Sequence, residues 1–518
     1  MVKVRELMIP MEDGARLFTR VVLPGDGKGT YPTVFMRTPY ENETTATAEL
    51  IEKYENNAFI RRGYAVVLQH CRGRGGSEGV CIPYSYKERS DGLATLDAVR
   101  KMPHYNGQIF LRGGSYTASV LLMMLGDNIP DLAGLAISVQ TESMYHRNYY
   151  NGLCRSWCGF TWWLSMISEH QPKIGRDEDI FIRPYIDMMR RATGKDLPDF
   201  TEELLHDRFD GFWKNDPRIG VIEKISVPVL FTSGWYDYYC YGMCSMWEKL
   251  SPETRAKSLF LMTPWGHGQK ERNDPDFPMP CGALPSDKDA AWFDHIRGAA
   301  PFPYGKEGDF RYYSIGEDVW KNAKSPYENE PSRAFFLSAD GMLVSKSPRG
   351  KELSYRYDPD RPFHHDRHDD MFLCDLPGTH ADVLSFVSEP FAEDAAFFGP
   401  VLFRLKVCSD RADTAFCMRL YYTEEGRSYN IVDAATTLLH ANPNAKPDRP
   451  SVIEIISQPT AFKVKKGAGI RVDISSWSDC YAPHPNTKRP LALARRAFTA
   501  KNTVFCGQSA VFLPESKA

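Results

Sequence analysis

Residues 31–140 alternate short apolar runs with stretches of helical spacing, and this alternation most limits the possible fold. Tyr31–Met36 and Tyr64–Gln69 are β-rich runs, and Leu132–Ser138 is a third. Between them, apolar residues recur at helical intervals in Asp91–Arg100. This β-α-β order predicts a mostly parallel sheet covered by helices.

The character of the sequence changes twice after this alternating part. From about residue 141 to 224, aromatic and charged residues are mixed, which predicts a helical insertion. Strand-like runs return at Val227–Ser233 and Ser258–Met262. After about Pro331, short strands separated by Gly, Pro and Asp turns predict an all-β sandwich. We therefore expect an α/β core (residues 1–140 and 226–330), a helical cap (141–225) and a C-terminal β-sandwich (331–518).

Charge and hydropathy exclude several classes of function. The 63 Lys and Arg residues nearly balance the 66 Asp and Glu residues, so we expect no attraction to nucleic acid. The longest apolar runs, such as Val120–Leu125, are too short for a membrane span. Charged and apolar residues alternate in Met1–Pro10, unlike a signal peptide, which predicts a cytoplasmic location. The sequence leaves open whether the protein forms a homo-oligomer.

The segment Gly113-Gly-Ser115-Tyr-Thr117 lies between a strand-like run and a helix-prone stretch. A strand, a sharp turn and a helix form the nucleophile elbow of an α/β-hydrolase, which makes Ser115 the candidate nucleophile. The turn needs small side chains around the serine, and Gly113 meets that need. Gly-x-Ser is common in long chains, so an ordinary glycine turn remains an alternative for this motif taken alone.

An acidic residue and a histidine follow Ser115 in the order expected for such a fold. Asp237 comes just after the strand-like run that ends at residue 233, and His267 comes after the next run. Taken singly, Asp237 is typical of a turn and His267 of a packed loop. Together, three polar residues at the carboxyl ends of parallel strands predict a Ser-His-Asp triad at one sheet edge.

These residues also carry a resemblance to a known family. Gly-x-Ser-Tyr, Gly-Trp-Tyr-Asp and Pro-Trp-Gly-His, in this order, resemble the cocaine-esterase-type hydrolases, which group with the X-Pro dipeptidyl-peptidase family. The resemblance covers almost the whole chain, and Ala118 departs from it because the family usually has glycine there. Further similar segments are Met11–Leu17, Arg37–Tyr40, Arg72–Gly79, Trp292–Asp294, Gly399–Val401 and Asp410–Phe416.

The resemblance implies an α/β-hydrolase core, a helical cap and a C-terminal jelly roll. It also implies that the hydroxyl of Tyr40 and the backbone N–H of Tyr116 form the oxyanion hole. Such donors meet the negative charge that develops during acyl transfer. We expect no cofactor.

The expected function is a serine hydrolase that cleaves an ester or amide of a small acyl substrate through an acyl-enzyme. Tyr149, Tyr150 and Trp163 in the cap, with Trp235, are expected to line the substrate pocket. Packing between cap helices explains the cap aromatics equally well. For Arg147, also in the cap, we expect a surface role.

Two other functions stay open. The first is an X-Pro dipeptidyl-peptidase or α-amino acid ester hydrolase, which must bind a substrate ammonium with carboxylates. Asp237 is followed by Tyr238-Tyr-Cys-Tyr241, which offers none. The second is a non-catalytic ligand-binding protein on a hydrolase scaffold.

Two further motifs resemble ligand sites. His364-His-Asp-Arg-His368-Asp-Asp370 contains metal-ligand types but lies in a Pro- and Asp-rich stretch. We expect it to be exposed to solvent and predict no metal site. Gly73–Gly79 lacks the spacing of a phosphate-binding loop and is expected to be structural.

Overall fold

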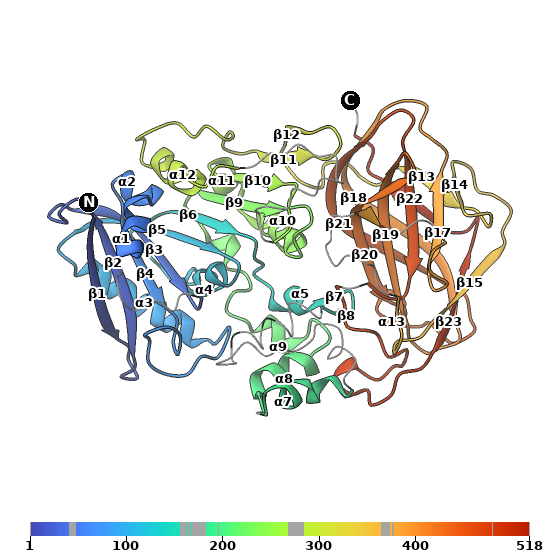
Figure 1. Cartoon of the computed structure of the whole chain (residues 1–518), viewed down its shortest axis with the longest axis horizontal. Helices are drawn as coiled ribbons and strands as arrows, with labels where there is room; N and C mark the ends of the chain where they lie inside the picture. The colour runs from blue at the N-terminus through green and yellow to red at the C-terminus, as the bar shows by residue number, and fades with distance from the viewer. Residues whose placement is uncertain are drawn as a thin grey trace.

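The computed structural model describes residues 2–40, 48–155, 162, 166, 183–194, 196–267, 284–363, 373–374, 378–478 and 480–516. Within these residues, one sheet has ten strands and another has twelve. Figure 1 shows the two sheets side by side, with a group of short helices below and between them.

The first sheet is the α/β core that the sequence predicts. Its central strands are parallel, and antiparallel strands pair at its two ends. Strands β9 and β10 are buried at every position, as expected for parallel strands covered on both faces. The strand order is β1 (Val2–Pro10), β2 (Arg16–Pro24), β4 (Ala65–His70), β3 (Tyr31–Thr38), β5 (Tyr105–Gly114), β6 (Leu132–Ser138), β9 (Val229–Gly234), β10 (Leu259–Thr263), β11 (Phe310–Ser314) and β12 (Val319–Ala323).

Helices cover this sheet and place the residues that follow each strand. Helix α4 packs against the sheet beside α3 and is buried at nearly every position. Leu121 and Leu122 belong to the main hydrophobic core, whereas Tyr116, Val120 and Met123 belong to a second cluster. The helices of this part are α1 (Ala48–Glu55), α2 (Ala58–Arg61), α3 (Lys87–Arg100), α4 (Tyr116–Met124), α10 (Cys240–Lys249), α11 (Pro252–Ala256) and α12 (Lys288–Ile296).

The chain between β6 and β9 forms a separate group of short elements, as expected for the cap. A hydrophobic cluster that includes Tyr145, Phe200 and Trp213 holds these elements together. They are α5 (Met144–Asn148), β7 (Tyr149–Tyr150), β8 (Leu153–Cys154), η3 (Tyr185–Asp187), α7 (Met188–Thr193), α8 (Pro198–Leu205), α9 (Gly211–Lys214) and η4 (Ile222–Lys224).

The C-terminal part is a β-sandwich, which confirms the all-β prediction. Alternate residues of its long strand β21 are buried and exposed, the pattern of a sheet with one face in a core. Its strands are β13 (Arg333–Leu337), β14 (Met342–Val344), β15 (Glu352–Tyr357), β16 (Leu373–Cys374), β17 (Leu384–Ser388), β18 (Ala395–Ser409), β19 (Ala415–Glu424), β20 (Arg427–Thr437), β21 (Ser451–Val464), β22 (Gly469–Ser475), β23 (Ala500–Phe505) and β24 (Ala510–Leu513), with the short helices α13 (Leu438–Ala441) and η5 (Leu491–Leu493).

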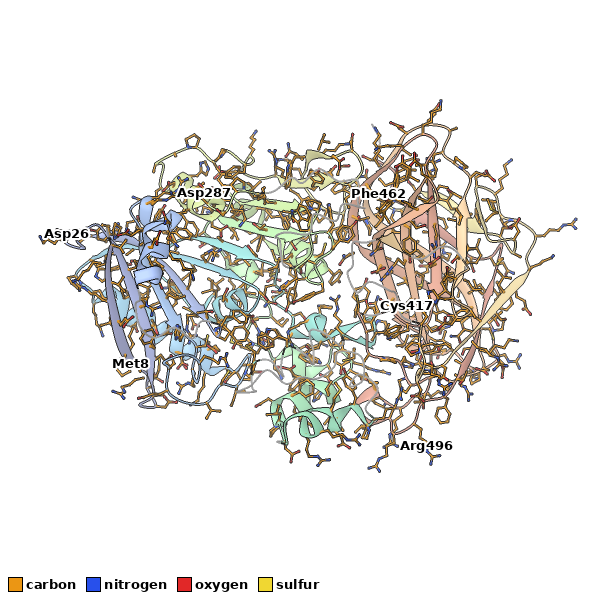
Figure 2. The ribbon with its side chains drawn as sticks, viewed as in Figure 1. Met8, Asp26, Asp287, Cys417, Phe462 and Arg496 are labelled. Carbon is orange, nitrogen blue, oxygen red and sulfur yellow. The ribbon has the colours of Figure 1, made fainter. Side chains whose placement is uncertain are left out.

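The sandwich packs against both other parts. Phe398 stacks on Tyr312 of the core with ring centroids 4.1 Å apart, and Phe462 pairs with Ile315 through a β-bridge. Phe462 lies on the side of the sandwich that faces the core (Figure 2). On the cap side, the hydroxyl of Tyr150 donates to the carbonyl of Ile456 at 3.1 Å.

We propose that the three domains have the limits expected from the sequence. Strands β11 and β12 still pair with the core sheet, and β13 is the first strand of the sandwich. This change of sheet supports a boundary near residue 331. The cap would then comprise residues 141–225, between β6 and β9.

Candidate active site

Ser115 lies in the sharp turn between β5 and α4. Its backbone has φ 55° and ψ −129°, a strained conformation for a residue other than glycine. A Cβ atom at Gly113 would lie 2.5 Å from the carbonyl oxygen of Thr117, so glycine is required there. The side chain of Gln140, just after β6, donates to the Ser115 carbonyl at 2.8 Å. This hydrogen bond holds the turn in place. The strand, turn and helix of a nucleophile elbow are therefore present.

The structure brings Ser115, His267 and Asp237 into one hydrogen-bonded chain. His267 Nε2 lies 3.0 Å from Ser115 Oγ, and His267 Nδ1 lies 2.8 Å from Asp237 Oδ2. Asp237 is 1% exposed, and its other carboxylate oxygen accepts the backbone N–H of Tyr239 at 2.6 Å. A buried carboxylate held in this way fixes the imidazole so that Nε2 faces the serine.

Two close contacts hold the loops that carry Asp237 and His267 in place. A Cβ atom at Gly234 would lie 1.9 Å from the carbonyl oxygen of Trp265, so the two loops can approach only because residue 234 is glycine. The ring of Tyr238 stacks on the imidazole of His267, with centroids 4.5 Å apart. These contacts leave the histidine little freedom to rotate away from Ser115.

Tyr40 and Tyr116 lie beside the serine, as the resemblance implies for an oxyanion hole. The rings of Tyr40 and Tyr116 meet edge-on with centroids 6.4 Å apart. Tyr40 is 44% exposed, yet desolvation still raises its pKa, while the nearby Trp162 and Ser115 side chains act in the opposite direction. The N–H of Tyr116 belongs to the first turn of α4, where N–H groups have no acceptor within the helix. Both groups could thus donate to an oxyanion.

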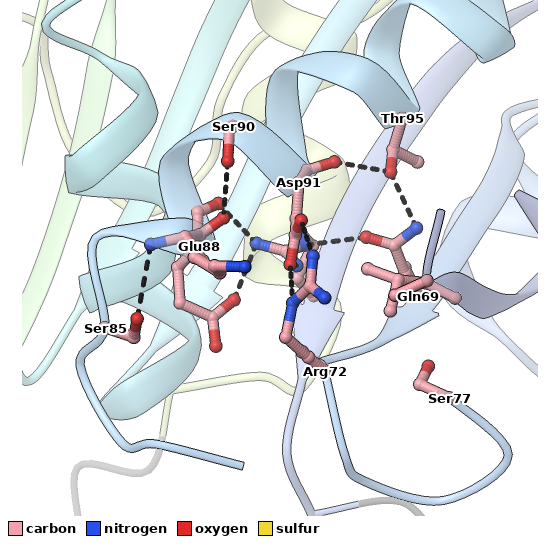
Figure 3. A network of polar contacts seen from close by, with 12 residues as sticks. Gln69, Arg72, Ser77, Ser85, Glu88, Ser90, Asp91 and Thr95 are labelled. Carbon is pink, nitrogen blue, oxygen red and sulfur yellow. Dashed lines mark hydrogen bonds and ion pairs between the residues drawn. The ribbon is translucent and has the colours of Figure 1, made fainter. Parts of the chain in front are cut away.

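A buried ion pair anchors Tyr116, and sequence reasoning missed it. The Tyr116 hydroxyl donates to Glu88 Oε1 at 3.1 Å, and Glu88 Oε2 lies 2.8 Å from Arg37 Nη1. The same network continues from Gln69 to Arg72 and Asp91 (Figure 3). A lone glutamate at the start of a helix gives no signal of burial; only the contact between α3 and β3 reveals its role.

Three of the four residues expected to line the pocket are buried and hydrogen-bonded within the protein. Tyr149 is 3% exposed and donates to the carbonyl of Leu204. Tyr150 also donates its hydroxyl, to the sandwich. Trp235 is 1% exposed and its indole donates to the carbonyl of Tyr313. Apolar packing and internal hydrogen bonds therefore account for these three aromatics.

The remaining expected residue, Trp163, lies outside the described residues. Its neighbour Trp162 instead approaches the site, donating from Nε1 to the Tyr40 hydroxyl at 3.2 Å. Arg147 is 1% exposed, so the expected surface role is wrong. Its guanidinium lies 4.5 Å from the ring centroid of Tyr84 and 5.1 Å from that of Trp162. Two adjacent tryptophans look alike in the sequence, so composition alone could not select residue 162.

Among the described residues, no group of three or more His, Cys, Asp or Glu side chains could hold a metal ion. The segment from His364 to Asp370 lies outside those residues. No helix in the described ranges combines the length and apolarity needed to cross a bilayer.

Comparison with known proteins gives a consistent result over both large parts of the chain. Residues 13–269 match the family model of the X-Pro dipeptidyl-peptidases (S15 family), and residues 305–510 match that of the X-Pro dipeptidyl-peptidase C-terminal non-catalytic domain. The chain is 24% identical to a cocaine esterase of Rhodococcus sp. (strain MB1 Bresler), over 92% of this chain and 88% of that protein.

Two solved structures share the whole fold. An α-amino acid ester hydrolase superimposes with a TM-score of 0.83 and 21% identity, covering 99% of this chain and 97% of that one. An aminopeptidase from a marine sediment archaeon, Thaumarchaeota archaeon, gives a TM-score of 0.83 and 20% identity, covering 99% and 96%. The two family matches together take in most of the sequence. The chain therefore belongs to the X-Pro dipeptidyl-peptidase (S15) family and is a serine hydrolase that acts on ester or amide bonds.

Proposed function

We propose that this protein hydrolyses an ester or amide of a small acyl substrate through an acyl-enzyme on Ser115. The observation that carries the proposal is the hydrogen-bonded chain from Ser115 Oγ through His267 to Asp237. Serine, histidine and buried aspartate in this arrangement are the parts that acyl transfer needs.

In the first half of the reaction, Ser115 Oγ attacks the substrate carbonyl while His267 Nε2 takes its proton. Asp237 stabilises the imidazolium that forms. The carbonyl oxygen becomes an oxyanion, which the Tyr40 hydroxyl and the Tyr116 N–H stabilise by hydrogen bonds. When the tetrahedral intermediate collapses, His267 returns the proton to the leaving alcohol or amine, and the acyl group stays on Ser115.

In the second half, a water molecule takes the place of the leaving group. His267 removes a proton from the water, which attacks the acyl carbonyl and forms a second oxyanion. Collapse breaks the bond to Ser115 Oγ, and His267 returns the proton to the serine. The acid is released and the free enzyme is restored.

Covalent labelling tests this mechanism directly. A fluorophosphonate probe should modify Ser115 alone, and peptide mass spectrometry should locate the adduct. The Ser115→Ala variant should give no adduct. An absence of labelling in the folded wild-type protein would instead favour a ligand-binding protein that has lost catalysis.

The type of acyl group is a second question, because family members recognised as X-Pro dipeptidyl-peptidases must bind a substrate ammonium. The residues after Asp237 offer Tyr238, Tyr239 and Cys240 and no carboxylate. Glu88, a buried carboxylate near Ser115, is already paired with Arg37. An ammonium bound without a carboxylate would lose its hydration without compensation, so we propose an acyl group without a free α-amine.

Matched substrates distinguish these alternatives. We expect p-nitrophenyl phenylacetate to have a higher kcat/KM than the p-nitrophenyl ester of phenylglycine, which differs by one α-amine. We also expect an X-Pro-p-nitroanilide to react slowly. A clear preference for either amine-bearing substrate would favour the peptidase or amino-ester hydrolase instead.

A further inference from the structure

Trp162 of the cap contacts the proposed oxyanion hole through its indole group. Trp162 Nε1 donates to the Tyr40 hydroxyl oxygen at 3.2 Å. A tyrosine hydroxyl has one proton to donate and two lone pairs that accept. Since the indole N–H occupies an acceptor position, the Tyr40 proton stays free for donation to another acceptor, and the Ser115 side chain lies close enough to affect the pKa of Tyr40.

Arg74 links the core segment before Tyr40 with the cap segment that follows Trp162. Its Nε donates to the carbonyl of Pro39 at 2.8 Å, directly before Tyr40. Its Nη1 donates to the carbonyl of Met166 at 3.1 Å, four residues after Trp162. One guanidinium group therefore links the backbone beside Tyr40 to the cap segment that carries Trp162.

The loop that carries Arg74 has a fixed shape. Gly73 has φ +66°, and a Cβ atom there would lie 2.2 Å from the backbone nitrogen of Cys81. The N–H of Gly73 donates to the carbonyl of Glu78, which closes the loop on itself. This explains Gly73 of the Arg72–Gly79 motif without a phosphate ligand: the turn there places Arg74 between the core and the cap.

The indole ring also packs on the residue that supplies the second oxyanion donor. Trp162 and Tyr116 are stacked with centroids 5.1 Å apart and an interplanar angle of 23°. Trp162 lies 5.0 Å from the ring of Tyr84, and the guanidinium of Arg147 lies over its face. Aromatic packing on several sides restricts the rotation of the indole and so keeps its N–H aimed at Tyr40.

We infer that Trp162, fixed by Arg74, is a positioning residue that orients and polarises the Tyr40 hydroxyl for donation to the oxyanion. This inference rests on the proposed function of Tyr40. The cap then contributes to transition-state stabilisation as well as to substrate binding. A group that acts only in the transition state changes kcat, whereas one that only binds the substrate changes KM.

A double-mutant cycle tests this role. Trp162→Phe removes the N–H and keeps an aromatic ring. We expect kcat to fall roughly 3- to 10-fold, the size of one hydrogen bond, with KM nearly unchanged. In the Tyr40→Phe background, which has no hydroxyl to orient, the same substitution should have no further effect on kcat.

A matched control comes from another cap tryptophan. Trp213 Nε1 donates to the carbonyl of His206 at 2.7 Å, within the cap. Trp213→Phe therefore also removes one indole hydrogen bond, but its effect on kcat should be small and should not depend on Tyr40.

Arg74→Lys tests the contact between Trp162 and Tyr40 from the core side, because lysine cannot bind both carbonyls in the same geometry. It should lower kcat in the wild type and not in the Tyr40→Phe background.

The outcomes separate the inference from the proposed function. If Trp162→Phe and Arg74→Lys lower kcat equally in both backgrounds, or change KM alone, Trp162 does not act through Tyr40 and the inference is wrong. Labelling of Ser115 by the fluorophosphonate would still support the proposed mechanism in that case. If the wild-type protein is not labelled, the proposed function itself fails.

Discussion

Glu88 accepts a hydrogen bond from the Tyr116 hydroxyl at 3.1 Å while its second carboxylate oxygen lies 2.8 Å from Arg37 Nη1. One buried carboxylate thus connects the residue after Ser115 with the strand that leads to Tyr40. Glu88→Gln keeps an oxygen that can accept from Tyr116 but removes one of the two carboxylates paired with Arg37, the other being Asp91 at 3.8 Å. We expect the free energy of unfolding to fall by about 1–3 kcal/mol, with a lower kcat, as measured by urea unfolding and ester turnover.

A half-exposed ion pair provides the control for this prediction. Glu78 and Arg16 are paired, with side chains 41% and 58% exposed. Glu78→Gln should lower the free energy of unfolding much less than Glu88→Gln does, because solvent screens such pairs. Equal losses in the two variants would contradict a special role for the buried pair.

The triad should behave as a unit. Ser115→Ala removes the attacking oxygen, and His267→Ala removes the base, so each should lower kcat by at least roughly 10⁴-fold. The double variant should be no worse than the more damaged single variant. Fully additive losses in kcat, measured with an activated ester, would show that the two residues do not act in one step.

Tyr40→Phe should lower kcat by roughly 10²–10³-fold and leave KM nearly unchanged, as expected for the loss of one oxyanion donor. Circular dichroism should show that the variant is folded. If KM alone changes, Tyr40 binds the substrate and does not stabilise the oxyanion.

The pH dependence of kcat gives a separate test of Tyr40. Burial raises its pKa, so the hydroxyl keeps its proton beyond the usual tyrosine range. We therefore expect no loss of kcat from Tyr40 ionisation up to about pH 10, the ordinary tyrosine pKa. A loss of activity between pH 8 and 9 in the wild type that Tyr40→Phe abolishes would contradict this.

His70 should make the protein less stable in acid. Burial lowers its pKa from 6.5 to about 4, with a smaller effect of Arg20. Below pH 6.5, His70 takes up a proton in the unfolded state, whereas in the folded state it is protonated only below about pH 4. Stability therefore falls with pH across this window, by on the order of 3 kcal/mol in total.

A conservative variant isolates this contribution. His70 Nδ1 accepts the backbone N–H of Gly76 at 3.3 Å. His70→Asn can offer an acceptor oxygen and cannot titrate, so its free energy of unfolding should depend less on pH between 6.5 and 4. An unchanged pH dependence in urea unfolding would show that other groups are responsible.

The sequence predicts the core strands and the triad for a clear physical reason. Parallel strands buried between two layers need continuous apolar runs, so the run Leu132–Ser138 coincides with the parallel strand β6. Polar residues that follow such runs collect at one edge of the sheet. This rule brings Asp237 and His267 to Ser115 without knowledge of the cap.

The cap and the buried charges could not be predicted in the same way. A tyrosine such as Tyr149 or Tyr150 suits a domain core and a pocket equally well, and only its hydrogen-bond partner distinguishes them. The pairing of Glu88 with Arg37 joins a helix to a strand far away in the sequence. Local spacing contains no information about such a contact.

The loop that leads to Asp237 should depend on the sandwich. Gln458 Nε2 donates to the carbonyl of Trp235 at 2.7 Å, and the Tyr236 hydroxyl donates to the carbonyl of Asn430 at 2.8 Å. Gln458→Ala should lower the free energy of unfolding by about 1 kcal/mol and reduce kcat, because the loop loses one support. Gln508→Ala, at an exposed glutamine that pairs with Lys406, should leave kcat unchanged.

These two hydrogen bonds also affect when a newly made chain becomes active. Synthesis proceeds from the N-terminus, so Ser115, Asp237 and His267 leave the ribosome long before Asn430 and Gln458. Until the sandwich folds against the core, the segment from Trp235 to Asp237 lacks its external support. We expect hydrolysis to begin only when the sandwich has folded against the core, so that folding of the sandwich sets the onset of the reaction.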